Sequence, residues 1–337
     1  MNLTCSFFQG VTNSMTARTL GVIVTTTLLT SHFAQAKWRV VSGTPRTSSW
    51  RAEDVYFADN LQGYLVNMSG EIFKSNDGGE TWNLQTRLPA RLRSVEFLSP
   101  QVGIVGSISN ESVYRTEDGG KTWKPVDPTH TFFEGVCGIS HVGNVIYAAG
   151  RFASGSTVYK SLDAGKTWTK KDLSHLATSL VDVHFENENE GYVTGHSATG
   201  QGAVLLKTTD GGKTWNVHYA TRSPMDHHVW KLEKINDKMM VGSIWANDHQ
   251  SPAYMIRSLD GGRTFTRHMV SPNYFYVEGI GFYDTQLGWM GGGDGLWETR
   301  DGGETWTHIN VGTYINRFYR LGNKLFAVGK EVLVYEP

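Results

Sequence analysis

Acidic, basic and histidine side chains recur along this chain at positions from which they could act together on a ligand. Each lies just before or early in a short run whose apolar and polar residues alternate as in a β-strand. If these strands surround one axis, the side chains near their starts line a common funnel. The set consists of Glu53, Asp54, Arg93, Glu134, Asp182, His227, His228, Glu278, Arg317 and Arg320.

Two of these carboxylates, Glu134 and Glu278, are candidates for the acid and base of a glycoside hydrolase. Such enzymes hold two carboxyl groups about 5 Å apart in retaining reactions and about 6.5 to 9.5 Å apart in inverting ones. A sialidase would need an arginine triad, but the early arginines, Arg46 and Arg51, do not lie in an Arg-Ile-Pro phrase. The remaining alternative is that the mixed charges only solvate a water-filled channel.

The adjacent residues His227 and His228, with His249 and His268 later in the same repeat, raise the question of a metal site. Neighbouring residues of a strand point to opposite faces, so this pair can ligate one ion only from a loop. We therefore predict no metal and no cofactor. The aromatic residues 274–276 and Trp245 are interpreted as packing residues, with stacking on a sugar ring or a peptide as the alternative.

An internal repeat reveals the elements that must position these side chains. Six octapeptides share the form Ser/Thr-x-Asp-x-Gly-x-Thr-Trp/Phe, which is the pattern of an Asp box. They start about 40 to 50 residues apart, the length of a four-stranded propeller blade. The octapeptides are residues 75–82, 116–123, 161–168, 208–215, 258–265 and 299–306.

The aspartates of these octapeptides are assigned a structural role. A carboxylate in a tight turn accepts hydrogen bonds from backbone N–H groups, glycine permits positive φ, and the Ser or Thr hydroxyl ties the turn together. The tryptophan then packs between neighbouring sheets. Because such turns lie far apart at the rim of a propeller, we do not assign metal or sugar binding to Asp77, Asp118, Asp163, Asp210, Asp260 and Asp301.

The same order of strand-like runs surrounds each octapeptide. In the first repeat the runs are residues 55–57, 63–66, 71–74 and 81–84. Three runs follow the last octapeptide, at residues 317–321, 324–328 and 332–335, and residues 38–41 look like the missing fourth. We predict an all-β, seven-bladed β-propeller whose last blade is closed by strands from both ends, with a six-bladed ring as the alternative.

The chain resembles the photosystem II assembly factors of plastids and cyanobacteria and their relatives in non-photosynthetic bacteria. The resemblance covers the whole mature chain. It lies in a repeated order of segments. An inner strand such as residues 54–57 leads to a second strand that starts with Gly63-Tyr64 or Gly288-Trp289, and then to an octapeptide such as residues 299–306. The closing segments 317–320, 326–329 and 332–335 are similar as well. The resemblance implies a seven-bladed propeller that acts without catalysis, as a binding platform for membrane-protein assembly.

The chain departs from this family in two places. Cyanobacterial members usually carry a lipobox cysteine at the end of the leader, where this chain has Ala34-Gln35-Ala36-Lys37, so we expect no lipid anchor. The arginine-rich binding face of the family is matched only by scattered arginines. These are Arg91, Arg93, Arg317 and Arg320.

The first 36 residues differ in composition from the rest. They contain no Asp or Glu, carry Arg18 as their only Lys or Arg, and run apolar from Leu20 to Leu29. This pattern predicts a signal peptide cleaved before Lys37, with Met15 as an alternative start; the run is too short and too rich in threonine for a membrane anchor. Residues 37–337 then form one periplasmic or secreted domain.

Cysteine content and charge limit the remaining function classes. Cys5 lies in the leader, so no intramolecular disulfide can form, and the apolar neighbours of Cys137 predict a buried thiol. The formal net charge is −1 and no basic stripe is present, which argues against nucleic acid and anionic membrane as partners. We predict a monomeric platform for a membrane or envelope protein; the alternative is a carbohydrate-active propeller, a glycosidase or a binder of polysaccharide.

Overall fold

The computed structural model describes residues 37–42, 51–109, 113–129, 131–150, 156–246, 248 and 250–337. The predicted signal peptide, Arg46 and His249 lie outside the described residues. Residues 36–337 form one compact unit. The part of the chain that is described contains no apolar helix long enough to cross a membrane.

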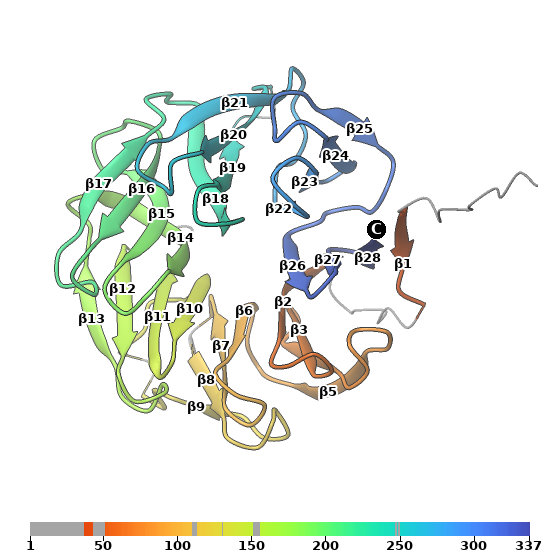
Figure 1. Ribbon diagram of the computed structural model, residues 1–337. Coiled ribbons are helices and arrows are strands. Elements are labelled where there is room, and N and C mark those ends of the chain that lie inside the picture. The colour runs from red at the N-terminus through yellow and green to blue at the C-terminus, as the bar shows by residue number, and fades with distance from the viewer. Residues whose placement is uncertain are drawn as a thin grey trace, which may run out of the picture. The chain divides into compact units, whose positions relative to one another are not determined.

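Seven antiparallel sheets of four strands each are arranged as blades around a common centre (Figure 1). In blades 1 to 6 the innermost strand comes first in the chain and the next three follow outward. Blade 1 contains β2 (Ala52–Phe57), β3 (Gly63–Asn67), β4 (Glu71–Ser75) and β5 (Asn83–Arg87). Blade 2 contains β6 (Leu92–Phe97), β7 (Gly103–Ser107), β8 (Val113–Thr116) and β9 (Lys124–Pro125). Blade 3 contains β10 (Gly138–Val142), β11 (Val145–Gly150), β12 (Thr157–Ser161) and β13 (Thr169–Asp172).

The next three blades repeat this order. Blade 4 contains β14 (Ala177–Phe185), β15 (Gly191–Ser197), β16 (Ala203–Thr208) and β17 (Asn216–Ala220). Blade 5 contains β18 (Asp226–Lys234), β19 (Met240–Ala246), β20 (Ala253–Ser258) and β21 (Thr266–Ser271). Blade 6 contains β22 (Ile280–Phe282), β23 (Gly288–Gly292), β24 (Gly295–Thr299) and β25 (Thr307–Ile309).

Blade 7 is composite. Its inner three strands are β26 (Arg317–Leu321), β27 (Lys324–Val328) and β28 (Val332–Glu336), and its outer strand is β1 (Lys37–Val40). β1 pairs antiparallel with β28, with Trp38 opposite Tyr335. The prediction of seven blades closed by strands from both ends is confirmed, and the six-bladed alternative is wrong.

The core is divided among the boundaries between blades. Seven clusters of buried apolar side chains occur among the described residues, one at each boundary. At the boundary of blades 1 and 2, for example, the rings of Tyr64 and Phe97 stack with centroids 3.7 Å apart. In blades 1, 2, 4 and 6 the second strand starts with glycine because space is lacking: a Cβ on Gly103 would lie 2.6 Å from Phe97 Cε1. Cys137 is buried, as predicted.

All six octapeptides fold into the same turn. In the third, Asp163 accepts the N–H of Thr167 at 2.8 Å and its hydroxyl at 2.6 Å, while Ser161 donates to Asp163 at 2.8 Å. These hydrogen bonds, with that of the Thr167 hydroxyl foremost, hold the pKa of Asp163 at about 2. The corresponding bonds recur at Asp77, Asp118, Asp210, Asp260 and Asp301. The fourth strand of blade 1 starts later than expected because Thr81 belongs to this turn.

Candidate functional site

The inner strands of blades 1, 2 and 5, like that of blade 4, carry β-bulges. The pairing register shifts between Ala52 and Asp54 in β2, and between Leu92 and Ser94 in β6. In β18 it shifts twice, between Asp226 and His228 and between Val229 and Lys231. A bulge inserts an extra residue and re-aims its side chain. In blades 1, 2 and 5 the extra residues are Glu53, Arg93, His227 and Trp230, three of which are candidates from the sequence.

Several of these side chains meet in a buried ion-pair network at the end of the ring where the inner strands begin, called the mouth below. Arg51 Nε lies 2.9 Å from Glu53 Oε1, and Arg51 Nη1 pairs with Glu278. Arg93 Nη1 lies 2.7 Å from Glu53 Oε2. Glu53 and Glu278 are each only 1% exposed. The network therefore ties blades 1 and 2 to the segment that leads into blade 6.

The two carboxylates of this network respond differently to their surroundings. Burial disfavours the charge of Glu53, but the guanidinium groups of Arg93 and Arg51 outweigh burial and lower its pKa. At Glu278 burial prevails over Arg51, and the pKa is raised. We expected both to line a solvated funnel, and this is wrong: each is enclosed and ion-paired.

Aromatic side chains surround the network at the mouth. The guanidinium of Arg93 lies 5.2 Å from the ring centroid of Trp230, whose Nε1 donates to Asn316 Oδ1 at 3.1 Å. The ring of Trp245 lies 5.9 Å from that of Trp230. Tyr276 is half-buried, and its pKa is raised first by burial and then by the neighbouring Glu278. The mouth thus combines enclosed charges with partly exposed rings.

Three histidines extend this arrangement. His227 Nδ1 and His228 Nδ1 are 2.7 Å apart, and His228 Nε2 is 2.7 Å from Ser179 Oγ. The ring of His196 stacks on that of His227 at 4.5 Å. The expectation that strand neighbours point to opposite faces is wrong here because the bulge at His227 turns both rings together. Burial, with His227 as the second cause, holds the pKa of His228 well below its ordinary value, so this imidazole is neutral.

The histidine cluster does not have the geometry of a metal site. No group of three His, Cys, Asp or Glu side chains in the described ranges could hold a metal ion. His268 lies on the outer strand β21, where its Nε2 is 2.7 Å from Thr266 Oγ1. The short contact between His227 and His228 instead requires one imidazole to donate a proton and the other to accept it.

Arg317 lies deeper, at the centre of the ring. Its Nε is 3.4 Å from Asp54 Oδ1, and its Nη1 is 3.0 Å from Glu233 Oε1 and 3.8 Å from Asp182 Oδ2. Burial opposes the charge of Arg317, but these carboxylates outweigh it and raise its pKa. The three acids belong to blades 1, 5 and 4, so one side chain of blade 7 links four blades. The alternative that the central charges merely solvate a channel is wrong for these paired groups.

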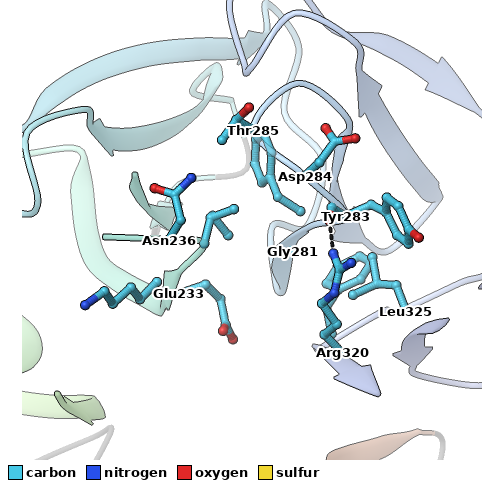
Figure 2. Close-up of a pocket in the computed structure, with 12 residues that line it drawn as sticks. Glu233, Asn236, Gly281, Tyr283, Asp284, Thr285, Arg320 and Leu325 are labelled. Carbon is cyan, nitrogen blue, oxygen red and sulfur yellow. Dashed lines mark hydrogen bonds between the residues drawn. The ribbon is translucent and has the colours of Figure 1, made fainter. Parts of the chain in front are cut away.

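The opposite end of the ring holds a pocket of about 300 Å³ between blades 5, 6 and 7. Figure 2 shows Glu233 and Asn236 on one side of this pocket, facing Asp284, Tyr283 and Arg320. Arg320 donates to the carbonyl of Tyr283 and lies over its ring, 4.4 Å from the centroid. Arg320 therefore does not share a face with Arg93.

The two proposed catalytic glutamates are not brought together. Glu134 is exposed on the loop before β10, where its N–H donates to the Tyr159 hydroxyl at 2.8 Å. Glu278 is enclosed and paired with Arg51. No hydrogen bond or ion pair among the described residues joins them. Arg91, the remaining arginine of the resemblance, is exposed and contacts Met68 Sδ at 3.7 Å.

In comparisons with known proteins, two family models each match part of the chain. The family described as "Photosynthesis system II assembly factor YCF48" matches residues 30–171, and that described as "Sortilin, neurotensin receptor 3" matches residues 111–254. A solved structure of YCF48 bound to a D1 peptide is 19% identical, with a TM-score of 0.66 over 91% of this chain and 98% of its own. The predicted resemblance to the photosystem II assembly factors is confirmed.

Other relatives of this assembly-factor-like propeller differ in how much they share. The photosystem II assembly lipoprotein Ycf48 of Synechocystis sp. is 41% identical over 72 residues, and the match spans about a fifth (21%) of its length. YCF48 from Cyanidioschyzon merolae is 20% identical, with a TM-score of 0.63 over 89% of this chain and 98% of its own. A GH74 xyloglucanase from Xanthomonas campestris reaches the same TM-score at 15% identity, over 87% of this chain and 52% of the enzyme. Likeness at this level of identity concerns the fold alone.

Proposed function

We propose that this chain is a non-catalytic binding platform, periplasmic or secreted, that assists the assembly or stability of a membrane or envelope protein complex. In this proposal a segment of a client protein binds at the mouth. The main support is the likeness to assembly factors over the whole propeller, including one solved with a bound peptide.

The chemistry of the mouth suits a peptide better than a reaction. Half-buried Tyr276, Trp245 and His227 offer rings that can pack against client side chains, and aromatic residues dominate the binding energy of many interfaces. Trp245 packs against Trp230, which in turn lies against Arg93 of the ion-pair network. An enclosed and paired Glu278 supports a structural role more than proton transfer to a sugar, so the carbohydrate-active alternative is not favoured.

The test compares two tyrosines at opposite ends of the same inner strand. Tyr276 precedes β22 at the mouth, and Tyr283 follows β22 at the other end; both are half-buried. Tagged wild type, Tyr276→Ser and Tyr283→Ser would be isolated from the native envelope after mild crosslinking, and partners would be identified by mass spectrometry. We expect a reproducible membrane or envelope protein with wild type and Tyr283→Ser, and its loss with Tyr276→Ser.

The proposal fails if no protein partner is recovered, or if both variants retain the partner equally. Polysaccharide retained by the bait would favour the alternative. In that case hydrolysis should be abolished by Glu278→Gln in a variant whose circular dichroism matches wild type.

A further inference from the structure

A groove on the outer rim between blades 3 and 4 is lined by four lysines and by no carboxylate. Its volume is about 360 Å³. The lining residues, called the lysine groove below, are Tyr147, Val158, Lys160, Leu162, Thr169, Lys170, Lys171, Gly211, Gly212 and Lys213. None of them belongs to the mouth or to the pocket at the opposite end.

The four lysines come from three different elements. Lys160 is the penultimate residue of β12 and directly precedes the third octapeptide. Lys170 and Lys171 belong to β13, and Lys213 is the sixth residue of the fourth octapeptide. In Figure 1, β13 runs along the outer edge of the ring. Lys170, Lys171 and Lys213 are exposed. Positions more than 40 residues apart in the chain thus converge, and for this reason no basic stripe is visible in the sequence.

Two of these lysines have no counter-charge. The side chains of Lys171 and Lys213 make no hydrogen bond or ion pair with the described residues. Lys160 donates to the carbonyl of Gly211 at 2.8 Å, and burial followed by repulsion from Lys213 lowers its pKa. Lys170 donates to the carbonyl of Phe132 at 3.3 Å, which leaves its charge uncompensated. The groove therefore concentrates positive charge: its lining holds no carboxylate, and Glu188 and Asp210, which attract Lys160, lie outside the lining.

An apolar side chain projects from the same groove. Leu162, the second residue of the third octapeptide, is 69% exposed, the largest value among the exposed large apolar side chains described. A leucine surrounded by lysines fits the boundary between the headgroups and the acyl chains of a bilayer, where the cations meet phosphate and the leucine leaves water. An acidic peptide would use the lysines but would leave Leu162 in water.

We propose that the lysine groove docks the propeller onto a membrane surface that presents the phosphate groups of anionic phospholipids. This inference goes beyond the proposed function, because the groove lies on the rim and needs no client protein. It also places a client-binding propeller next to the membrane.

The fold contains its own control groove, between blades 5 and 6. Leu259 occupies the same octapeptide position as Leu162 and is 60% exposed, but this groove is lined by Asp301 and Glu304 as well as by Lys238 and Arg257. The position equivalent to Lys213 is Glu304. The two grooves thus share a turn and a leucine and differ in charge.

The test measures co-sedimentation with vesicles of phosphatidylglycerol and phosphatidylcholine, using the protein isolated from its native envelope. The main variant is Lys170→Gln/Lys171→Gln/Lys213→Gln. The charge-matched control is Lys37→Gln/Lys238→Gln/Lys330→Gln, which changes three exposed lysines on other blades. Every variant must keep the circular dichroism melting profile of its wild type. Any leader left on the chain is common to all variants and cancels in the comparison.

We expect wild type to bind these vesicles, to bind phosphatidylcholine alone weakly, and to be released by salt. Each basic residue near an anionic surface contributes about fivefold to partitioning, so the main variant should lose about 100-fold and the control much less. Leu162→Ser should weaken binding, and Leu259→Ser should not.

Three outcomes overturn the proposal. In the first, the main variant binds vesicles as tightly as wild type does. In the second, the control variant loses as much vesicle binding as the main variant. In the third, the groove binds soluble glycerol phosphate or polyglutamate, but wild type binds vesicles no more tightly than the main variant does. Because no client protein is present, the result is independent of the partner recovery described above.

Discussion

Ala164 is a residue whose side chain conflicts with its backbone. It has a φ of 58°, a left-handed conformation that favours glycine, and glycines with positive φ occupy the same position in the other five octapeptides. An alanine in this conformation costs roughly 1 kcal/mol, part of which is offset because alanine restricts the unfolded chain. The turn in blade 3 therefore contains a small backbone strain at Ala164, which lowers the stability of the folded state.

Replacing Ala164 with glycine should raise the free energy of unfolding by about 0.5 kcal/mol, measured by urea denaturation. The reverse change in a sister turn, Gly119→Ala, should lower it by about 1 kcal/mol, because Gly119 has a φ of 70° and a Cβ there would lie 3.1 Å from the Pro100 carbonyl. If Ala164→Gly instead lowered the free energy of unfolding and Gly119→Ala raised it, as chain entropy alone predicts, the strain would be absent.

Arg317 contributes more to stability than Ala164, because it faces carboxylates of three blades. Its replacement by methionine leaves Asp54, Asp182 and Glu233 without their shared cation. We expect a loss of about 3–5 kcal/mol in unfolding free energy, greater at pH 8 than at pH 5 because acid lets the orphaned carboxylates take up protons. Arg320→Met, at the exposed end of the same strand, should change stability by about 0.5 kcal/mol or less.

Because of Glu233, the free energy of unfolding should decrease as the pH rises. Burial is the main cause that raises its pKa to about 7, well above its ordinary value of 4.5. The folded state therefore holds a proton that the unfolded state releases. The resulting stability is complete below about pH 4.5 and is lost as the pH rises through 7.

Glu233→Gln, which cannot titrate, should gain stability relative to wild type by about 1–3 kcal/mol between pH 4.5 and pH 8, measured as the difference between paired urea titrations. A difference that stays constant over this range would contradict the raised pKa.

At the scale of strands, the sequence predicted far more of the fold than of the site. Octapeptide spacing and period-two alternation are local signals, and they located the blades and the closing strand. The bulges at Glu53, Arg93 and His227 gave no such signal, because one extra residue in a strand looks like ordinary sequence. A regular strand without the bulge places the neighbours His227 and His228 on opposite faces, which is what the sequence predicted. Ion pairing across the ring, as between Arg51 and Glu278, depends on contacts between residues 227 positions apart.

The short strand β1 makes a specific contribution to closure. The ring of Trp38 lies 5.0 Å from that of Trp289 and 5.6 Å from that of Tyr335, within the apolar cluster at the boundary of blades 6 and 7. Trp38→Ala should lower the free energy of unfolding by about 2–3 kcal/mol, while Trp38→Phe should lower it by about 1 kcal/mol. Thermal melts that match wild type for both variants would show that β1 does not hold the ring closed.

At the scale of the whole molecule, each blade depends on its neighbours for its apolar clusters. We therefore expect the ring to unfold as one unit. Trp38→Ala in blade 7 and Ala164→Gly in blade 3 share no contact, so their effects on unfolding free energy should add in the double variant to within about 0.5 kcal/mol. Tryptophan fluorescence and far-ultraviolet circular dichroism should give coincident transitions. Separate transitions would mean that the blades unfold independently.

The pairing of β1 with β28 also has a consequence for how the protein folds. Blades 1 to 6 are built from segments close in sequence, whereas this one pairing joins residues almost 300 positions apart. The loop entropy of such a contact must be lost before any of its stabilising energy is gained. We infer that registration of β1 is the last and slowest step of folding. Until then two strand edges stay open, and another copy of the chain could occupy them in a domain swap.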